Sequence, residues 1–457
     1  MNPDIRRIVG ITFDGRPIFE PKGTANSYIL GAAGSGKTTS VTIPIVQSLL
    51  ADTGRAIIIN DVKNGEIAAQ IAPLCARYGR CFGVIDEFAV LGANFPYRLS
   101  LNPFGPILGS HPHDRPFVVE AINRVLVEEP GDDAKNFFWR ENQREVLDVV
   151  ESTLHGRTSR LVFPGSAYAL LNDPETWIAA LTIEAEDGEP PLRGKARQLL
   201  DLRDNNPEHY SQHVRGALSA LKAFGAEPLA NAGRGAHLTH ADLIRDHWVV
   251  CLVSPVRHAY RLGPFYALHL LAFMNAQLSG AIGRTDYILD EFCNAPLKEM
   301  LDRVTIQRGF GARSHFIAQS HQDVVRKYGQ KEAALLEENC TVKQHLKFTR
   351  FEEAERVSKA MGEMVSVSRG LGISSEHLGI SGNFSTGRER VFTPVELMQL
   401  PDDEQIVHVA GVGFIHCKKI RQNQIAPTCY HLGDNPLEGA RLPPDPRVTL
   451  PTPKIRS

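Results

Sequence analysis

The sequence lacks long apolar runs and has no segment of the kind that targets or anchors a protein to a membrane. A membrane-spanning helix needs about 18 or more apolar residues. The best candidate, FYALHLLAFMNAQL, is interrupted by His269, Asn275 and Gln277. The first ten residues, MNPDIRRIVG, have no apolar core of a signal peptide. We therefore expect a soluble, cytoplasmic chain without a transmembrane segment of its own.

Paired cysteines and an excess of charge of one sign are also missing. The seven cysteines are scattered without any C-x-x-C pair, so neither a disulfide framework nor a zinc site is supported. Free thiols agree with a reducing compartment. The net charge of −2 argues against a surface coated with nucleic-acid-binding charge, although a local basic patch would be hidden in that total. At 457 residues, the chain is long enough for more than one domain.

A phosphate-binding loop is the most specific motif that is present. The stretch YILGAAGSGKTTSVTIPIV begins as an apolar strand, breaks into small residues and resumes with a helical pattern. It fits Gly-x4-Gly-Lys-Thr at every fixed position, so backbone N–H groups at a helix N-terminus would surround phosphates. Lys37 is expected to bind the β- and γ-phosphates of ATP, and the Thr38 hydroxyl to bind Mg²⁺. The predicted nucleotide-binding residues are Gly31, Gly34, Ser35, Gly36, Lys37, Thr38 and Thr39.

An acidic pair at the end of another apolar strand completes the predicted site. In YILDEF, Asp290 is expected to bind Mg²⁺ together with Thr38, and Glu291 to act as a base or to orient the attacking water. Gln319, in IAQS at the end of the next strand, could sense the γ-phosphate, or it could be a structural strand-end glutamine. VIDEF at 84–88 is a look-alike. We prefer the pair in YILDEF because IAQS follows it on the next predicted strand.

The order of apolar runs and helical patterns indicates an α/β fold with a mostly parallel central sheet. Helical spacing dominates the middle of the chain, which predicts an inserted all-α domain. Strands are predicted at 55–61, 81–86, 247–254, 286–292, 314–320 and 340–348. The predicted units are a discontinuous nucleotide-binding domain at 1–107 and 243–428, the helical insertion at 108–242, a Ser- and Gly-rich mobile loop at 363–390, a hairpin within 404–422, and a Pro-rich extended tail at 429–457.

The motifs occur in an order that resembles the type IV secretion coupling proteins of the TraG/TraD group. The similar segments are GAAGSGKTTS, IINDVKNGE, LNPF, FFW, ILDEF, TIQRGFGAR, IAQSHQDVVRKYG and FTPVELMQLP. The resemblance implies a RecA-like P-loop NTPase with an all-α domain inserted between the two halves of its site. It further implies an ATP- and Mg²⁺-dependent homo-hexamer that delivers DNA–relaxase complexes or effector proteins to the inner-membrane components of a secretion channel.

The resemblance also assigns residues and shows two departures. Lys37 and its loop match the family's first nucleotide motif, Asp290 and Glu291 match the second, and Gln319 matches the glutamine of the following strand. Arg308 matches an arginine that would reach a neighbouring subunit's nucleotide; the alternative is a helix-capping arginine. In DVKNGE, Asn64 is interposed, which puts the family roles of Lys63 and Glu66 in doubt. The usual N-terminal transmembrane helices are missing: either a membrane partner recruits the chain, or it is a soluble variant of the motor, or the chain was trimmed. We expect a naturally soluble form that a partner recruits to the inner membrane.

Two other functions compete with a secretion motor. One is a HerA/FtsK-like DNA translocase outside secretion, which the helical insertion and FTPVELMQLP disfavour. The other is a soluble adaptor that binds nucleotide and collects cargo without pumping it. ATP turnover with and without single-stranded DNA distinguishes the adaptor from both motors.

Overall fold

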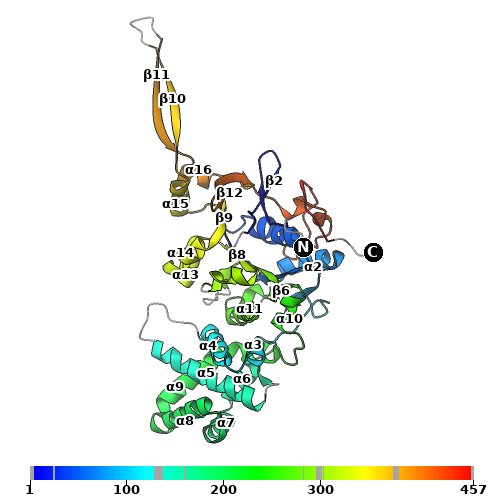
Figure 1. Ribbon diagram of the computed structural model, residues 1–457, viewed down its shortest axis with the longest axis vertical. Helices are drawn as coiled ribbons and strands as arrows, with labels where there is room; N and C mark the ends of the chain where they lie inside the picture. The colour runs from blue at the N-terminus through cyan, green and yellow to red at the C-terminus, as the bar shows by residue number, and fades with distance from the viewer. Residues whose placement is uncertain are drawn as a thin grey trace.

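One large sheet forms the centre of the molecule. The computed structural model describes residues 5–23, 26–127, 137–158, 161–280, 282–294, 301, 303–373 and 380–453. In the described chain the central sheet has eleven strands in the order β2-β1-β13-β12-β9-β3-β8-β7-β4-β6-β5. Figure 1 shows this sheet in the middle, with the helices of the insertion gathered at one end and a hairpin projecting from the other.

The sheet has a parallel part and an antiparallel part. The parallel strands are β3 (Asn26–Gly31), β4 (Arg55–Asp61), β5 (Phe82–Ile85), β6 (Val249–Val253), β7 (Arg284–Leu289), β8 (Ala312–Ala318) and β9 (Cys340–Lys347). The antiparallel strands are β1 (Ile8–Ile11), β2 (Pro17–Phe19), β12 (Glu404–Val409) and β13 (Gly413–Lys418). The six strands predicted after the phosphate-binding loop, the hairpin within 404–422 and the α/β class with a mostly parallel sheet are confirmed.

Both faces of the parallel strands are buried, which explains their continuous apolar sequences. On β3, Ile29 belongs to one core cluster, and its neighbours Tyr28 and Leu30 belong to the other. The helices that accompany the strands of the sheet are α1 (Ile43–Leu49), α2 (Glu66–Arg77), α11 (Gly263–Leu278), α13 (His321–Tyr328), α14 (Gln330–Glu338), α15 (Phe351–Met361) and α16 (Pro394–Met398).

Helices fill the chain between β5 and β6. The described residues there form α3 (Gly105–Gly109), α4 (Arg115–Leu126), α5 (Phe137–Arg157), α6 (Pro164–Asn172), α7 (Pro174–Asp187), α8 (Pro190–Asn205), α9 (Pro207–Ala220) and α10 (His240–Arg245), and no strand. This helical content agrees with the predicted insertion. The limits 108 and 242 of a separate domain stay a prediction, because the insertion and the sheet share one apolar cluster.

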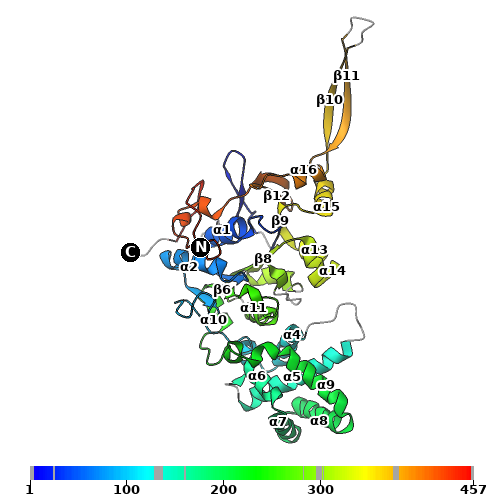
Figure 2. The same cartoon turned by 180° about the vertical axis from the view of Figure 1, so that it is seen from behind.

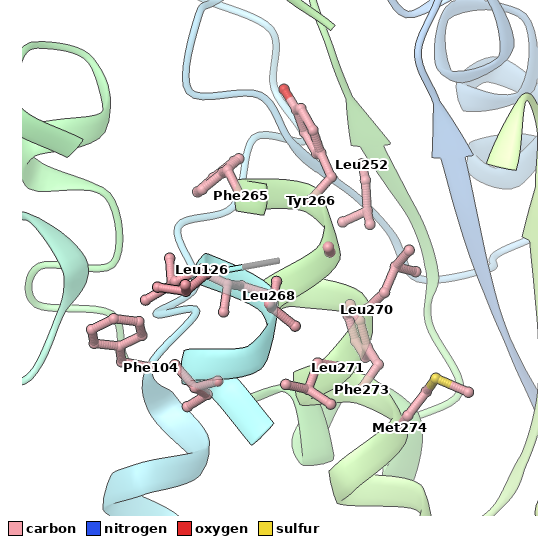
Figure 3. Close-up of a cluster of buried hydrophobic side chains, with 14 of the residues drawn as sticks. Phe104, Leu126, Leu252, Phe265, Tyr266, Leu268, Leu270, Leu271, Phe273 and Met274 are labelled. Carbon is pink, nitrogen blue, oxygen red and sulfur yellow. The ribbon is translucent and has the colours of Figure 1, made fainter. Parts of the chain in front are cut away.

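Helix α11 joins the insertion to the sheet. Ten consecutive residues, 265–274, are buried, since the helix has the sheet on one side and the insertion on the other. Figure 3 shows Phe104, which precedes α3, and Leu126 of α4 beside Leu268 and Leu271 of α11, with Leu252 of β6 on the other side. The apolar run at 265–274 is therefore a core helix. Across the described chain, no helix is both long and apolar enough to cross a lipid bilayer.

The prediction of a loop at 363–390 is wrong. Strands β10 (Glu363–Ile373) and β11 (Ile380–Arg390) pair antiparallel along their whole length, and residues 374–379 lie outside the described chain. The hairpin projects beyond α15 and α16, as both views show (Figures 1 and 2). From Val365 to Ile373, every second residue is apolar except Arg369, which is the period of a strand with one interruption. The abundance of Ser and Gly concealed this pattern.

The prediction of an extended tail at 429–457 also needs correction. Strand β15 (Val448–Thr449) pairs with β14 (Ile425–Ala426), and Val448 and Leu450 are buried against Ile8 and Ile11 of β1. Residues 454–457 lie outside the described chain. The proline-rich sequence contains few regular elements, but it packs on the nucleotide-binding domain.

A buried charge cluster connects the sheet strands near their N-terminal ends. Asp286 of β7 is fully buried and accepts hydrogen bonds from Arg55, from Arg313 (Nε–Oδ1 2.5 Å) and from His315 (Nε2–Oδ1 2.9 Å). Burial alone would raise the pKa of Asp286, but the charges of Arg313 and Arg55 hold it well below its usual range. The Asp286 carboxylate therefore balances, together with Asp52 and Glu20, the charges of Arg55 and Arg313.

Replacement of the Asp286 carboxylate tests how much it contributes to the stability of the fold. We expect Asp286→Asn to lower the free energy of unfolding by about 3–5 kcal/mol, because it removes the fully buried counter-charge that Arg55 and Arg313 share and leaves them only Asp52 and Glu20. Asp445→Asn is the control, since the Asp445–Arg447 pair (3.2 Å) is exposed and should contribute less than about 1 kcal/mol. Urea unfolding of the two variants measures the difference. Equal, small losses would contradict the assignment.

Candidate nucleotide-binding site

The predicted phosphate-binding loop connects β3 to the first helix. Gly34 and Gly36 have φ of 75° and 86°, in the left-handed region that glycine tolerates best. A short π-helical turn, Thr38–Thr42, follows and continues into α1. Ser40 N donates to Gly36 O at 2.7 Å, which closes the first turn against the loop. Small residues and a helix N-terminus thus lie where the sequence predicts a phosphate cradle.

Side chains of the loop are buried or bonded to the loop backbone, as shown by Ser35, Lys37 and Thr39. Lys37 is 5% exposed, and its Nζ donates to Gly31 O at 2.7 Å. Ser35 is buried, and its hydroxyl has no hydrogen-bond partner within the described chain. The Thr39 hydroxyl donates to Gly36 O at 3.5 Å. Lys37 therefore lies along the inner side of the loop.

The acidic pair meets the loop lysine across the sheet. Asp290 and Glu291 follow β7, and only β8 separates β7 from β3. Lys37 Nζ is 3.4 Å from Glu291 Oε1, and Gln319, which follows β8, donates from Nε2 to Glu291 Oε2 at 3.3 Å. Glu291 has φ of 51°, which is uncommon for a residue with a side chain and is typical of functional sites. The structure brings Lys37, Glu291 and Gln319 together as predicted.

Asp290 is buried and incompletely paired. It is 1% exposed, its Oδ2 is 3.9 Å from Lys63 Nζ, and its Oδ1 has no partner among the described residues. Burial raises its pKa to about 6, the charge of Glu291 acts in the same direction, and the charge of Lys63 opposes the shift. A buried carboxylate oxygen without a donor, together with the Thr38 hydroxyl, suits a hard divalent cation such as Mg²⁺.

The sequence left two residues of this site in doubt. Lys63 Nζ is 3.4 Å from Glu291 Oε1, and Glu66 Oε2 accepts from the Thr38 hydroxyl at 3.4 Å. The interposed Asn64 and the next residue, Gly65, have φ of 55° and 73°. With two successive residues in the left-handed conformation, the backbone accommodates the extra residue and still brings Lys63 and Glu66 to the site. The segment IINDVKNGE, which contains both residues, resembles the family in spite of its changed spacing. It was therefore the sequence signal that could have identified Lys63 and Glu66 as site residues.

Arg308 lies away from the other predicted site residues. It is exposed in the 3₁₀ turn Gln307–Phe310, just before β8 begins, whereas Gln319 follows the end of β8. Seven residues of β8, at about 3.3 Å each, separate the two ends by roughly 20 Å. Arg308 lines a cavity of about 220 Å³ whose cationic residues are Arg6, Lys22, Arg55, Arg284, Arg308 and Arg313. Within one chain, Arg308 does not meet Lys37 or Glu291.

The look-alike acids at 84–88 are in a different place. They follow β5, the outermost strand, which four other strands separate from β3. Asp86 accepts from the backbone N–H groups of Val90 and Leu91, both at 2.9 Å, so it stabilises its own loop. The preference for Asp290 and Glu291 agrees with this geometry.

Comparison with known proteins identifies the family. The model of the family described as "Type IV secretory system Conjugative DNA transfer" matches residues 8–435. The chain therefore belongs to the conjugative DNA transfer family of type IV secretory systems. This membership supports a role in secretion over a HerA/FtsK-like translocase outside it. No curated protein sequence matches the chain.

Solved structures share the fold. The bacterial conjugative coupling protein TrwBdeltaN70, in its unbound monoclinic form, has a TM-score of 0.66 and 18% identity over 90% of this chain and 88% of that chain. TrwB in complex with ADP and Mg²⁺ has a TM-score of 0.64 and 17% identity, over 90% and 89%. VirB4 of Thermoanaerobacter pseudethanolicus has a TM-score of 0.54 and 15% identity, over 92% and 97%. The RecA-like P-loop NTPase fold is confirmed.

The burial of Asp290 predicts a cost in stability that depends on pH. Its carboxyl ionises near pH 3.8 when unfolded and near pH 6 when folded. Ionised Asp290 thus destabilises the folded chain progressively as pH rises through this window. In buffer without nucleotide and Mg²⁺, we expect Asp290→Asn to be more stable than the wild type by about 1–3 kcal/mol at pH 7.5, and by less at pH 5. Unfolding curves at both pH values, with Asp445→Asn as control, check this. A less stable Asn variant at pH 7.5 would contradict it.

Proposed function

We propose that this chain is an ATP-hydrolysing coupling motor that delivers DNA–relaxase complexes or effector proteins to a type IV secretion channel. The observation that carries the proposal is the meeting of Lys37, Asp290, Glu291 and Gln319 at one edge of the sheet. Family membership and the likeness to TrwB, whose structures include complexes with ADP and Mg²⁺, support it. Recruitment to the inner membrane by secretion-system components is part of the proposal.

Each side chain has a role that follows from its position. Lys37 binds the β- and γ-phosphates of ATP, for which loop N–H groups supply further donors. Glu291 orients the attacking water and accepts its proton, and Gln319 holds the second oxygen of Glu291. Thr38 and Asp290 would hold Mg²⁺, which neutralises phosphate charge when bound. Lys63 forms an ion pair with Glu291 (Nζ–Oε1 3.4 Å) and so helps to hold this carboxylate in place.

Arg308 completes the proposal through a second copy of the chain. It lies at the sheet edge opposite the nucleotide, so it cannot serve the site of its own chain without a large movement. In a closed ring, as family membership implies for a homo-hexamer, this edge would face the neighbour's nucleotide. The 220 Å³ cavity beside Arg308 is lined by six cationic residues and by Glu20, and Arg55, Arg284 and Arg313 already pair with carboxylates, so Arg308 itself is the charge offered to a neighbour's triphosphate in this proposal. An arginine provided in this way is worth about 10³–10⁵ in rate in related systems.

Loss of the loop lysine tests hydrolysis. We expect Lys37→Ala to lower the rate of ATP turnover by about 10²–10³ or more. The negative charge that develops on the phosphates in the transition state would lose the lysine that stabilises it. Lys359→Ala is the matched control, because this exposed lysine on α15 pairs only with Glu355 among the contacts of the described chain (3.2 Å). Phosphate release is measured with and without single-stranded DNA. A wild type without turnover under either condition would support the nucleotide-binding adaptor instead.

Mixing two inactive variants tests the role of Arg308. Arg308→Ala and Lys37→Ala should each lack turnover, but a mixed ring joins the intact loop of one variant to the intact arginine of the other. We expect recovery of about a quarter of the wild-type rate, because one in roughly four random pairings is complete. Arg326→Ala, an exposed arginine on α13, should keep full activity. If mixing restores nothing, Arg308 does not act across subunits.

A further inference from the structure

The segment 419–435 is attached to the nucleotide-binding domain by buried polar contacts. Gln47 of α1 donates from Nε2 to Gln422 O at 3.0 Å, and Gln422 donates from Nε2 to Gln70 Oε1 of α2 at 2.7 Å. Gly433 N donates to Gln70 O at 2.8 Å. All three glutamines are at most 2% exposed. Because buried polar groups are costly without partners, these contacts fix where the segment lies.

At one end of this segment, Asn435 is connected through Glu66 to Thr38, which is a predicted Mg²⁺ ligand. Asn435 donates from Nδ2 to Glu66 Oε1 at 3.0 Å, and Glu66 Oε2 accepts from the Thr38 hydroxyl at 3.4 Å. The three side chains are 3%, 8% and 7% exposed, in that order. The carboxylates of Asp61 and Asp290 are near enough to interact electrostatically with Glu66. The amide of Asn435 therefore holds a carboxylate that other acids repel, and it leaves the second oxygen of Glu66 directed at Thr38.

The other end reaches the loop itself. Lys419 follows β13 and is 6% exposed. Its Nζ donates to Ser35 O at 3.1 Å and to Asp402 O at 2.9 Å. Ser35 lies between Gly34 and Gly36, the two loop residues with positive φ. Lys419 therefore fastens the loop at the point where glycine gives the backbone the most freedom.

We propose that the segment 419–435 is a clamp that preorganises the nucleotide site from outside. Asn435 positions Thr38 for Mg²⁺ through Glu66, and Lys419 holds the phosphate-binding loop through Ser35. Both are positioning residues, since neither contacts the reacting atoms. The inference rests on the proposed function, because it assumes that the loop binds a nucleotide with Mg²⁺. Preorganisation lowers the entropy that the loop loses when a ligand binds.

Binding of a fluorescent ADP analogue (mant-ADP) at increasing Mg²⁺ concentration tests Asn435. We expect Asn435→Ala to raise the half-saturating Mg²⁺ concentration about three- to tenfold, somewhat below the usual 10- to 100-fold effect of groups that touch a metal ligand directly. Binding in EDTA should not change. Asn423→Ala is the matched control, since it removes an amide of the same segment that donates to Pro443 O, and it should behave as the wild type. Asn435→Asp keeps the side-chain size but places an oxygen against Glu66, so it must show the same or a larger shift.

Lys419 is tested in the same assay. Lys419→Met should weaken mant-ADP binding about equally in Mg²⁺ and in EDTA, since it loosens the loop and leaves the metal ligands in place. Lys418→Met is its control, because the adjacent Lys418 pairs with Asp403 at 3.1 Å, away from the loop. Thermal unfolding confirms that each variant is folded. Wild-type binding by both Asn435 variants and by Lys419→Met would overturn the clamp. Failure of the wild type itself to bind mant-ADP would overturn the proposed function.

Discussion

The parallel register of β3, β8 and β7 is the constraint on which the nucleotide site depends. Parallel strands place their carboxyl ends at one edge of the sheet. Strand pairing therefore brings together residues that are distant in the sequence, without a need for direct contacts between their side chains. The loop after β3 provides Lys37, the end of β8 provides Gln319, and the end of β7 provides Glu291. Only one strand lies between the lysine and the glutamate. The helical insertion lengthens the chain between β5 and β6 but leaves this register intact.

The carboxyl and amino ends of the same parallel strands differ in role: the carboxyl ends carry the nucleotide site, and the amino ends carry a charge cluster that stabilises the fold. At the carboxyl edge, Asp290 has a raised pKa, and its Oδ1 has no hydrogen-bond partner among the described residues, so this carboxylate suits the binding of a cation. At the amino edge, Asp286 is saturated with donors and stabilises the fold. A cationic surface around Arg308 borders this second edge. One sheet can thus hold a nucleotide at one edge and offer an arginine to a neighbour at the other.

The sequence predicted the local parts of the site and all seven parallel strands, because each depends on a short contiguous pattern. Spacing alone could not place Lys63 and Glu66, since two left-handed residues absorb the extra Asn64. The hairpin at 363–390 was missed because its composition concealed a strand period. The contacts of Asn435 and Lys419 were also missed. They join residues hundreds of positions apart through single hydrogen bonds, which produce no periodicity.

We propose that the amide-lined loop and the distant acidic pair form one pocket for a metal-bound triphosphate. Calorimetric titration of the wild type with ATP, in Mg²⁺ and in EDTA, tests it most directly. We expect saturable 1:1 binding in Mg²⁺ that weakens in EDTA and disappears in Lys37→Ala. Absence of binding by folded wild-type protein, or affinity unaffected by Mg²⁺, would contradict it.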